Sequence, residues 1–174
     1  WQDDMSGRLL FSAVLAAADR GVQVRLLLDD NNTMGLDHTL SELSRHKNIQ
    51  VRLFNAFSFR TLRALGYLTD FARLNRRMHN KSFTVDREVT IVGGRNVGDE
   101  YFGAGDEPLF SDLDVMAIGP VVNEVTDDFE RYWESHAVQP FSKVVDIEHE
   151  AERAAASLPA EWLNNPQVKR YLQR

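Results

Sequence analysis

The side chains best suited to catalysis lie between His79 and Asn96. Valine and isoleucine residues in this stretch form two short β-type runs, and the polar turn at 86–88 between them predicts a hairpin. Residues two apart on a strand point to the same face, so we expect His79 and Lys81 to project side by side. Lysine supplies a positive charge for phosphate oxygens, and histidine can attack or transfer a proton near neutral pH. The pair therefore predicts a phosphate site.

Further hydrogen-bond donors follow the second run. Gly93 and Gly94 allow a tight turn or the close approach of a ligand, because neither residue has a Cβ atom. Arg95 and Asn96 come directly after them, and both side chains donate hydrogen bonds. We expect these residues to add donors to the same phosphate site.

The complete pattern resembles the HKD motif of the phospholipase D superfamily. Its elements are His-x-Lys, an Asp, a Gly pair and an Asn, represented here by His79, Lys81, Asp86, Gly93, Gly94 and Asn96. The flanking stretches 27–31, 76–81 and 110–115 further resemble the bacterial cardiolipin synthase branch of the superfamily. The resemblance covers most of the chain, and the number of matching positions makes a chance surface hairpin a poor explanation.

The resemblance implies a specific chemistry. Two motifs would face each other, and one histidine would attack phosphorus to form a phosphohistidine intermediate while the other would exchange protons with the two alcohols. We take His79 as the nucleophile, although the sequence leaves open which histidine of the pair attacks. Lys81 and Asn96 would hold the phosphate oxygens, and Asp86 is expected to brace the hairpin. No metal or cofactor is required.

The resemblance also implies an acidic side chain that orients the catalytic imidazole. Asp112 and Asp114 share a face at the start of a predicted strand over 113–118, and we favour Asp112. The irregular stretch over 99–110 would lie at the rim of the active site, which makes Tyr101 a candidate substrate contact. The candidate substrate-binding residues are thus Lys81, Gly94, Arg95, Asn96 and Tyr101.

Alternating helical and strand-like patterns predict an α/β fold. We expect a mixed, mainly parallel sheet flanked by helices, that is, a phospholipase D-like half that is normally paired with a second half. Helical spacing predicts a helix over 10–18 with Ser6 as its N-cap, and further helices over 36–46 and 62–74. Strands are predicted over 22–28 and 49–53. A helix that begins at Pro120 carries an apolar stripe, expected to face the core, formed by Val121, Val125, Phe129 and Trp133.

Residues 1–138 are predicted to form the HKD domain, and residues 139–174 a linker helix and tail that lead toward an absent second half. Only one copy of the motif is present, so the chain would supply half of an active site. It would either dimerise or be the N-terminal half of a longer protein. We favour the second explanation, because the strand expected before the first helix is missing from an abrupt start.

The charge is unevenly distributed. Residues 1–100 have a net charge of +2 and residues 101–174 a net charge of −8. Arginines gather between residues 57 and 81, which suits an anionic substrate unless they form one solvated helix face. A domain that binds nucleic acid along a duplex is usually more basic, which argues against nucleic acid as a partner. The sequence has no cysteine and no apolar run long enough to span a bilayer.

Two smaller stretches have alternative explanations. Asp29 and Asp30 follow a predicted strand, where they could contribute to a site, but we favour a capping or loop role. Phe57 and Phe59 could touch acyl chains at a membrane surface, but packing within the domain is favoured.

The resemblance implies a phosphatidyltransferase of the cardiolipin synthase type. Its partners would be an anionic phospholipid substrate, the bacterial membrane surface and a second HKD half, and it would lie peripherally on the cytoplasmic face of the inner membrane. Two alternatives are a phospholipase D-like phosphodiesterase or nuclease, and a non-catalytic half that binds lipid or serves assembly.

Overall fold

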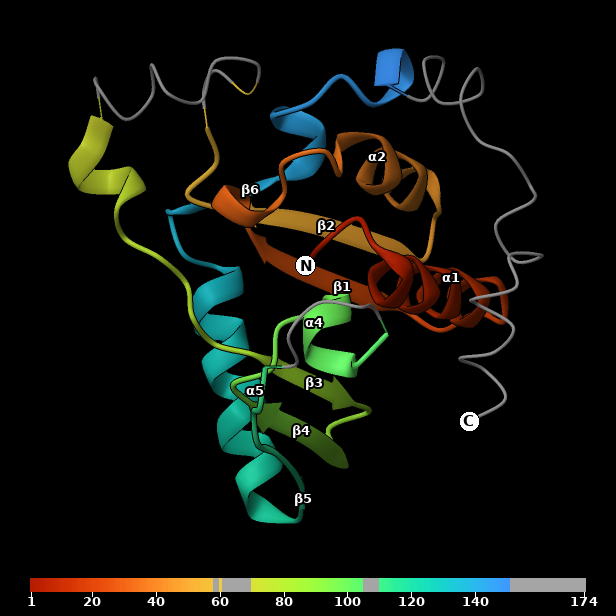
Figure 1. Ribbon diagram of the computed structural model, residues 1–174, viewed down its shortest axis with the longest axis vertical. Coiled ribbons are helices and arrows are strands. Elements are labelled where there is room, and N and C mark those ends of the chain that lie inside the picture. The colour runs from red at the N-terminus through yellow and green to blue at the C-terminus, as the bar shows by residue number, and fades with distance from the viewer. Residues whose placement is uncertain (58–59, 61–69, 105–109, 151–174) are drawn as a thin grey trace.

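The computed structural model describes residues 1–57, 60, 70–104 and 110–150, and it contains two three-stranded sheets (Figure 1). The first sheet has the order β1 (Val24–Asp29), β2 (Ile49–Phe54) and β6 (Val138–Pro140). The second has the order β3 (Ser82–Val85), β4 (Val89–Gly93) and β5 (Asp114–Ile118). The labelled helices are α1 (Met5–Asp19), η1 (Asp30–Asn32), α2 (Asp37–Arg45), α4 (Asp99–Phe102), α5 (Pro120–Trp133) and η2 (Phe141–Lys143), and residues 70–74 and 147–150 are helical as well.

The predicted α/β architecture, with sheets flanked by helices, is confirmed, but its strands are less parallel than expected. Strands β1 and β2 run parallel, with Val24 opposite Ile49. The other three pairings of the described strands are antiparallel. The difference arises because the predicted hairpin of β3 and β4 is antiparallel, and because β5 pairs antiparallel with β4 instead of extending the first sheet.

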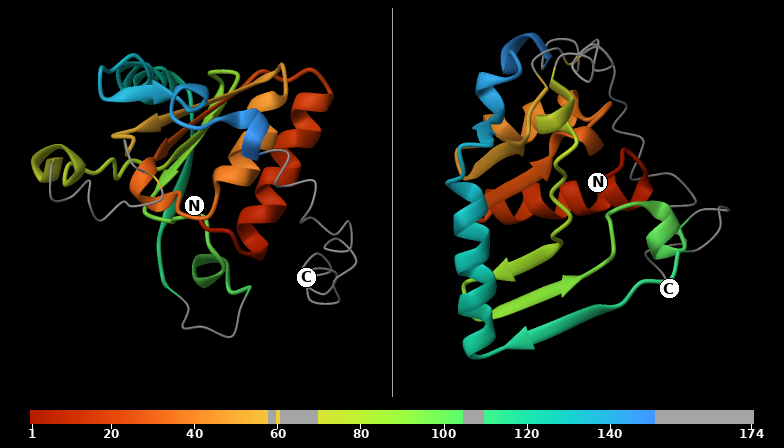
Figure 2. Two further views of the ribbon diagram at one scale, coloured as in Figure 1. Left: turned by 90° about the horizontal axis from the view of Figure 1, so that it is seen from above. Right: turned by 90° about the vertical axis from the view of Figure 1, so that its left-hand side faces the viewer.

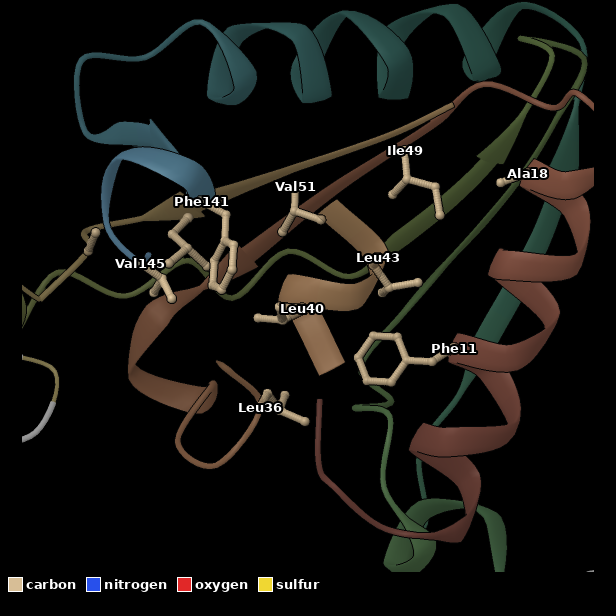
Figure 3. Close-up of a cluster of buried hydrophobic side chains, with 11 residues drawn as sticks. Phe11, Ala18, Leu36, Leu40, Leu43, Ile49, Val51, Phe141 and Val145 are labelled. Carbon is tan, nitrogen blue, oxygen red and sulfur yellow. The ribbon is translucent and has the colours of Figure 1, made fainter. Parts of the chain in front are cut away.

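The hydrophobic core lies between the first sheet and the two helices α1 and α2 (Figure 3). Alternate residues of β2 are buried, as a strand with one face on the core requires. Helix α2 contributes residues three and four apart, which lie on one helix face. The core residues include Phe11, Ala18, Leu36, Leu40, Leu43, Ile49, Val51 and Leu53.

Helix α5 spans both sheets and joins them (Figure 2). Near its end, the Trp133 ring lies under the guanidinium groups of Arg52 and Arg25 from the first sheet, at 4.4 and 5.4 Å from the ring centroid. Arg25 also pairs with Glu130 at 2.6 Å. Nearer its start, α5 packs on the second sheet, where Thr90 is buried. The helix thereby fixes the hairpin relative to the first sheet.

The predicted apolar stripe of α5 is only partly correct. Trp133 is buried as expected, but Val121 is exposed. The buried side of the helix is instead formed by Val122, Thr126 and Trp133. The stripe is displaced because the helix packs on two sheets at once rather than on a single apolar layer.

The face of the second sheet opposite α5 is apolar and exposed. Phe83, Ile91 and Met116 lie side by side in one row across its three strands, and Met116 is 72% exposed. Val85 and Ile118 lie in the neighbouring row, and both are also exposed. An apolar patch of this kind on a folded domain usually marks an interaction surface.

The beginning of α1 differs from the prediction. Asp4, not Ser6, is the N-cap, and its side chain accepts a hydrogen bond from the Gly7 backbone N–H at 2.8 Å. Asp99 accepts another from the Ser6 N–H at 2.7 Å, while Asp4 accepts one from the Asp99 N–H at 2.6 Å. The two carboxylates thus cap each other's helices and tie α1 to α4.

Three further expectations concern the ends of elements. Next to the predicted boundary at residue 138, β6 pairs with β2 and Phe141 is buried. Of the predicted helix over 62–74, the structure describes residues 70–74, which are helical. Phe57 is buried, which confirms packing within the domain, whereas Phe59 lies outside the described residues.

Candidate active site

His79 and Lys81 lie in an extended segment that leads into β3. His79 is exposed and Lys81 is half-buried, with its Nζ donating a hydrogen bond to the His79 backbone carbonyl at 2.9 Å. Burial lowers the pKa of Lys81, and the carboxylates of Asp112 and Asp29 partly oppose this shift. The ammonium group is therefore held in a partly dehydrated place within the influence of two acidic groups, close to the backbone of the histidine.

Asp29, at the end of β1, holds the segment that carries these residues. Its carboxylate accepts hydrogen bonds from the Met78 backbone N–H at 2.9 Å and from Arg77 Nε at 3.1 Å. It also accepts one from the Asn31 N–H at 3.0 Å, which caps η1 as predicted. The carboxyl end of a strand is where open α/β sheets place their ligands. Asp29 thereby links the first sheet to the approach to His79.

Asp30 has an internal role. Its carboxylate is fully buried and accepts hydrogen bonds from the Phe57 backbone N–H at 2.7 Å and from Thr33 Oγ1 at 2.5 Å. It also forms an ion pair with Arg60. A buried carboxylate with this many donors is a structural group, which agrees with the loop role predicted for it.

The paired glycines are required by the approach of β5 to β4. A Cβ atom on Gly93 would lie 2.0 Å from Asp114 Oδ1 and 2.6 Å from the Leu113 carbonyl oxygen. A Cβ atom on Gly94 would lie 2.0 Å from Asp112 Oδ1. The close neighbours of both glycines are thus parts of the protein, and the glycines allow the two aspartates to lie against the strand.

Arg95 braces this region from within. Its Nε donates to Asp114 at 2.6 Å, its Nη2 donates to the Asp112 carbonyl at 3.0 Å, and its Nη1 donates to the Tyr101 carbonyl. All three guanidinium nitrogens thus bond to protein groups. The structure therefore assigns Arg95 a positioning task, while the predicted contact with substrate stays a prediction.

Asn96 and Tyr101 are brought together. Asn96 Nδ2 donates a hydrogen bond to the Tyr101 hydroxyl at 2.9 Å. The Tyr101 ring stacks on Phe110, with ring centroids 5.3 Å apart. Since Tyr101 lies on α4, the cross-capped start of that helix also fixes the hydroxyl that orients the Asn96 amide.

Asp112 and Asp114 differ in their surroundings. The Asp114 carboxylate is committed to Arg95. No hydrogen bond to the Asp112 carboxylate comes from the described part of the chain, and this carboxylate contributes to the field at Lys81. Asp112 is therefore the acidic group with acceptor capacity to spare, which supports the choice of Asp112 without testing its role.

Asp86 lies away from these groups. It occupies the hairpin turn at the opposite end of β3 from Lys81, and both Asp86 and Arg87 have positive φ, at 52° and 60°. Two consecutive residues of this kind are typical of tight hairpin turns. The structure thus places Asp86 where it can shape the turn, as expected, and does not bring it to the candidate site.

Most of the arginines before the motif are paired internally. Arg60 pairs with Asp30 and Asp37, Arg73 with Asp70, and Arg77 with Asp29. Arg63 lies outside the described residues. The predicted basic surface is therefore smaller than the sequence suggests, because the acidic partners of Arg60 and Arg77 come from distant parts of the chain that contact this segment only in the fold.

Sequence reasoning missed one group that builds the site. Asn55, at the end of β2, donates from Nδ2 to the carbonyls of Arg73 and Arg76 at 3.1 and 2.6 Å. It is buried and has a positive φ of 50°. A single asparagine after a strand has too many possible roles to be chosen from sequence, although its tolerance of positive φ was a usable signal.

The arrangement suits phosphate chemistry. It combines an accessible imidazole, a half-buried ammonium group, an oriented amide and a carboxylate with free acceptor capacity. Over the described ranges, no three His, Asp or Glu side chains form a group that could hold a metal ion. None of the helices in these ranges is long and apolar enough to cross a membrane.

The chain is similar to known proteins of the cardiolipin synthase family. The family described as "Cardiolipin synthase, PLD-like domain" matches residues 4–133. The chain is 67% identical over 174 residues to "Cardiolipin synthase C" of Escherichia coli K12, covering all of this chain and 37% of that protein.

The chain is also similar to more distant relatives. The chain is 44% identical over 147 residues to an uncharacterized protein of Helicobacter pylori 26695, covering 82% of this chain and 29% of that protein. It is 36% identical over 133 residues to "Cardiolipin synthase A" of Pseudomonas fluorescens Pf-5, covering 75% of this chain and 26% of that protein. The chain thus spans between about a quarter and little more than a third of the length of these curated relatives. By this match and by its HKD residues, the chain belongs to the cardiolipin synthase PLD-like domain family of the phospholipase D superfamily.

Proposed function

We propose that this chain supplies one half of the active site of a phosphatidyltransferase of the cardiolipin synthase type. The observation that carries the proposal is the placement of Lys81, which lies next to His79 in a partly dehydrated position close to the Asp112 carboxylate. The match to cardiolipin synthases over the whole chain supports the same reaction class. The substrate would be an anionic phospholipid.

In the first step, a nitrogen of the His79 imidazole attacks the phosphorus of a phospholipid diester. The bond from phosphorus to the leaving alcohol breaks, and the histidine of the second half gives that alcohol its proton. A phosphohistidine intermediate results. The exposure of the His79 side chain leaves it accessible to a diester.

In the second step, the hydroxyl of an acceptor lipid attacks the same phosphorus. Its proton passes to the histidine of the second half, the nitrogen–phosphorus bond breaks, and the new diester leaves. Exchanging the roles of the two histidines gives the same products, and His79 is assigned the attack as the simpler hypothesis.

Lys81 and Asn96 lower the barrier by holding the non-bridging oxygens. Negative oxygens repel a nucleophile, and preorganised donors are the usual means of offsetting this repulsion. The pKa of Lys81 is lowered by burial, but the nearby carboxylates of Asp29 and Asp112 help to keep the side chain charged. Asn96 is oriented by its bond to Tyr101.

Asp112 is proposed to orient the catalytic imidazole. A carboxylate that accepts a hydrogen bond from one ring nitrogen fixes the tautomer and leaves the other nitrogen free to attack. The Asp112 carboxylate has no donor among the described side chains, and Gly94 allows it to lie directly against β4. Asp86 is proposed to brace the hairpin turn.

The partner that completes the site is proposed to be a second HKD half, from the same full-length protein or from a second subunit. The chain has one motif, and the described part of the second sheet leaves the apolar row of Phe83, Ile91 and Met116 exposed. We further propose that residues 1–138 are the HKD domain and that residues 139–174 lead toward this second half. The complete protein would act peripherally at the cytoplasmic face of the bacterial inner membrane.

The experiment is lipid mass spectrometry on a cardiolipin-deficient bacterium that expresses the complete reading frame containing this sequence. Cardiolipin is expected with the unaltered protein and with His149→Ala, which changes an exposed histidine far along the chain. None is expected with His79→Ala.

Other outcomes separate the alternatives. Absence of cardiolipin in all three strains, with the protein shown to be present, would reject phosphatidyl transfer. Release of free headgroup or cleavage of nucleic acid would then indicate a phosphodiesterase. Cardiolipin formed equally by the His79→Ala protein would show that this half serves binding or assembly rather than catalysis.

A further inference from the structure

A second basic site lies at the end of β2, apart from His79. It is a cavity of about 580 Å³ between the segment over 70–76 and the chain that enters and leaves β6. An aromatic floor and a basic rim line it. The lining includes Phe54, Phe57, Arg73, Arg76, His136 and Lys143.

The rim carries uncompensated positive charge. Within the described residues, the side chains of Arg76, His136 and Lys143 have no hydrogen bond or ion pair, in contrast to the other arginines of this region. The acidic lining residue Asp70 is bound to Arg73 at 2.5 Å. Arg76 and Lys143 thus face the cavity as available cations, and their charge favours an anion there.

The cationic wall is held in place by the fold. The buried amide of Asn55 binds the carbonyls of both Arg73 and Arg76, and the Asn55 N–H donates to the Ala137 carbonyl at 2.8 Å. Both sides of the cavity are therefore attached to the same residue at the end of β2. Because these contacts exist before any ligand arrives, less ordering is needed when an anion binds.

The floor of the cavity is apolar. Phe57 is 2% exposed, and Ala56 and Val144 add aliphatic surface. Phe54 is supported from behind by Tyr132, with ring centroids 5.9 Å apart. An apolar floor with a cationic rim matches a ligand that joins a phosphate group to an apolar body.

We propose that this cavity binds the phosphate group of an anionic amphiphile, with Arg76 and Lys143 as the principal contacts. The site is distinct from the His79 site, because Arg77 is directed to Asp29 whereas its neighbour Arg76 lines the cavity. The two sites are connected by three residues of extended chain, a span of about 10 Å. A ligand in the cavity would thus be held beside the segment that carries His79.

The test uses the full-length protein with His79→Ala, so that no turnover occurs and the result does not depend on the reaction proposed above. Two double variants of equal charge are compared. Arg76→Gln with Lys143→Gln removes the cations of the cavity, and Arg20→Gln with Lys47→Gln removes two exposed cations elsewhere. Binding is measured by flotation with phosphatidylglycerol or phosphatidylcholine vesicles and by calorimetry with inorganic phosphate.

Phosphatidylglycerol vesicles are expected to bind the parent protein and the Arg20/Lys47 variant equally well. They are expected to bind the Arg76/Lys143 variant about tenfold more weakly. Hydrogen exchange of the segments 53–57 and 136–144 should slow when ligand binds. If the protein binds phosphatidylglycerol vesicles and also binds inorganic phosphate, the phosphate group itself is the ligand. If it binds phosphatidylglycerol vesicles but not inorganic phosphate, the ligand is a lipid headgroup. Equal losses in the two double variants, or unchanged exchange in both segments, would overturn the proposal.

Discussion

The Asp29 carboxylate accepts a hydrogen bond from the Met78 backbone N–H at 2.9 Å, so the end of β1 holds the chain one residue before His79. The side chain of Asp29 is 9% exposed, which leaves little access for water to replace the bond. The position of the candidate nucleophile thus depends on a residue far from it in the sequence.

Asp29→Ala should therefore lower the free energy of unfolding by about 1–3 kcal/mol, because it leaves a half-buried N–H without an acceptor. Asp29→Asn, which keeps an acceptor oxygen, should lose less. Denaturant unfolding measures both changes, and amide exchange at Met78 should accelerate. Asp127→Ala, which removes an exposed partner of Arg87, is the control and should change stability by no more than about 0.5 kcal/mol. Equal effects of Asp127→Ala and Asp29→Ala would contradict the assigned role.

The two glycines of the motif should respond differently to alanine. In Gly93→Ala, the new Cβ atom meets the backbone of β5, so the strand must move, at a cost of about 1–3 kcal/mol. In Gly94→Ala, the three atoms nearest to it all belong to the Asp112 carboxylate, which can rotate away. We expect a clear fall in Tm for the first variant, and lost activity with a smaller fall for the second.

Gly98→Ala is the matched control for the glycine variants, because the three atoms nearest to its Cβ atom are in side chains, at 3.0 and 3.1 Å in Gln2 and at 3.3 Å in the Asp4 carboxylate. It should leave Tm nearly unchanged. A Gly94→Ala protein with full activity would show that the close placement of Asp112 against β4 is not needed for the reaction.

Arg95→Lys should behave as a severe substitution. A lysine cannot reproduce three donors in one plane, so the bonds to Asp114, Asp112 and Tyr101 cannot all be kept. We expect a lower Tm and reduced kcat. Arg87→Lys, at an exposed pair with Asp127, is the comparison and should change neither value. Unchanged kcat in Arg95→Lys would argue that the brace is dispensable.

Tyr101→Phe removes the hydroxyl that orients Asn96. A single hydrogen bond has a net worth of about 0.5–1.5 kcal/mol, so kcat/KM should fall roughly 3- to 10-fold. The decisive measurement is a double-mutant cycle with Asn96→Ala. If the tyrosine acts through Asn96, its loss should have little further effect in the Asn96→Ala protein. Additive losses would instead indicate that Tyr101 contacts the substrate itself.

The lowered pKa of Lys81 predicts a pH dependence. The side chain carries its charge below its pKa and loses it above, so anion binding should weaken at a lower pH than an ordinary lysine would cause. Between the lowered and the ordinary pKa, the unfolded chain holds more protons, so the contribution of Lys81 to the free energy of unfolding rises with pH there.

The alkaline arm of a plot of KM against pH measures the titration of Lys81. Lys81→Arg should move this arm to higher pH, because arginine stays charged, even if the rate is lower. An alkaline arm that is the same in both proteins would have to come from another group.

Much of this arrangement was predictable from local patterns. The hairpin, β1, β2 and β5 follow from alternating or continuous apolar runs, and the motif residues identify the catalytic segment. The sequence could not place Arg60, because its ion pairs with Asp30 and Asp37 join residues far apart in the chain. Because ion pairs of this kind could not be predicted, the basic stretch appeared to have more unpaired positive charge in the sequence than it has in the fold.

The role of the paired glycines shows the same limit. Their spacing marks a place where something comes close, but a ligand and a neighbouring strand leave the same signature in one sequence. Only the pairing of β4 with β5 shows that Asp112 and Asp114 are the close neighbours. Likewise, Asn55 could not be chosen because its partners are backbone carbonyls, which have no residue type.

The attachments at Asn55 and Asp29 have a consequence for tolerance to insertion. The chain leaves the first sheet after β2, and it is fastened again by Asn55 to the carbonyls of residues 73 and 76 and by Asp29 to Met78. These hydrogen bonds, rather than the number of residues that precede Arg73, set the position of His79. An insertion that leaves them intact should therefore leave His79 in its place.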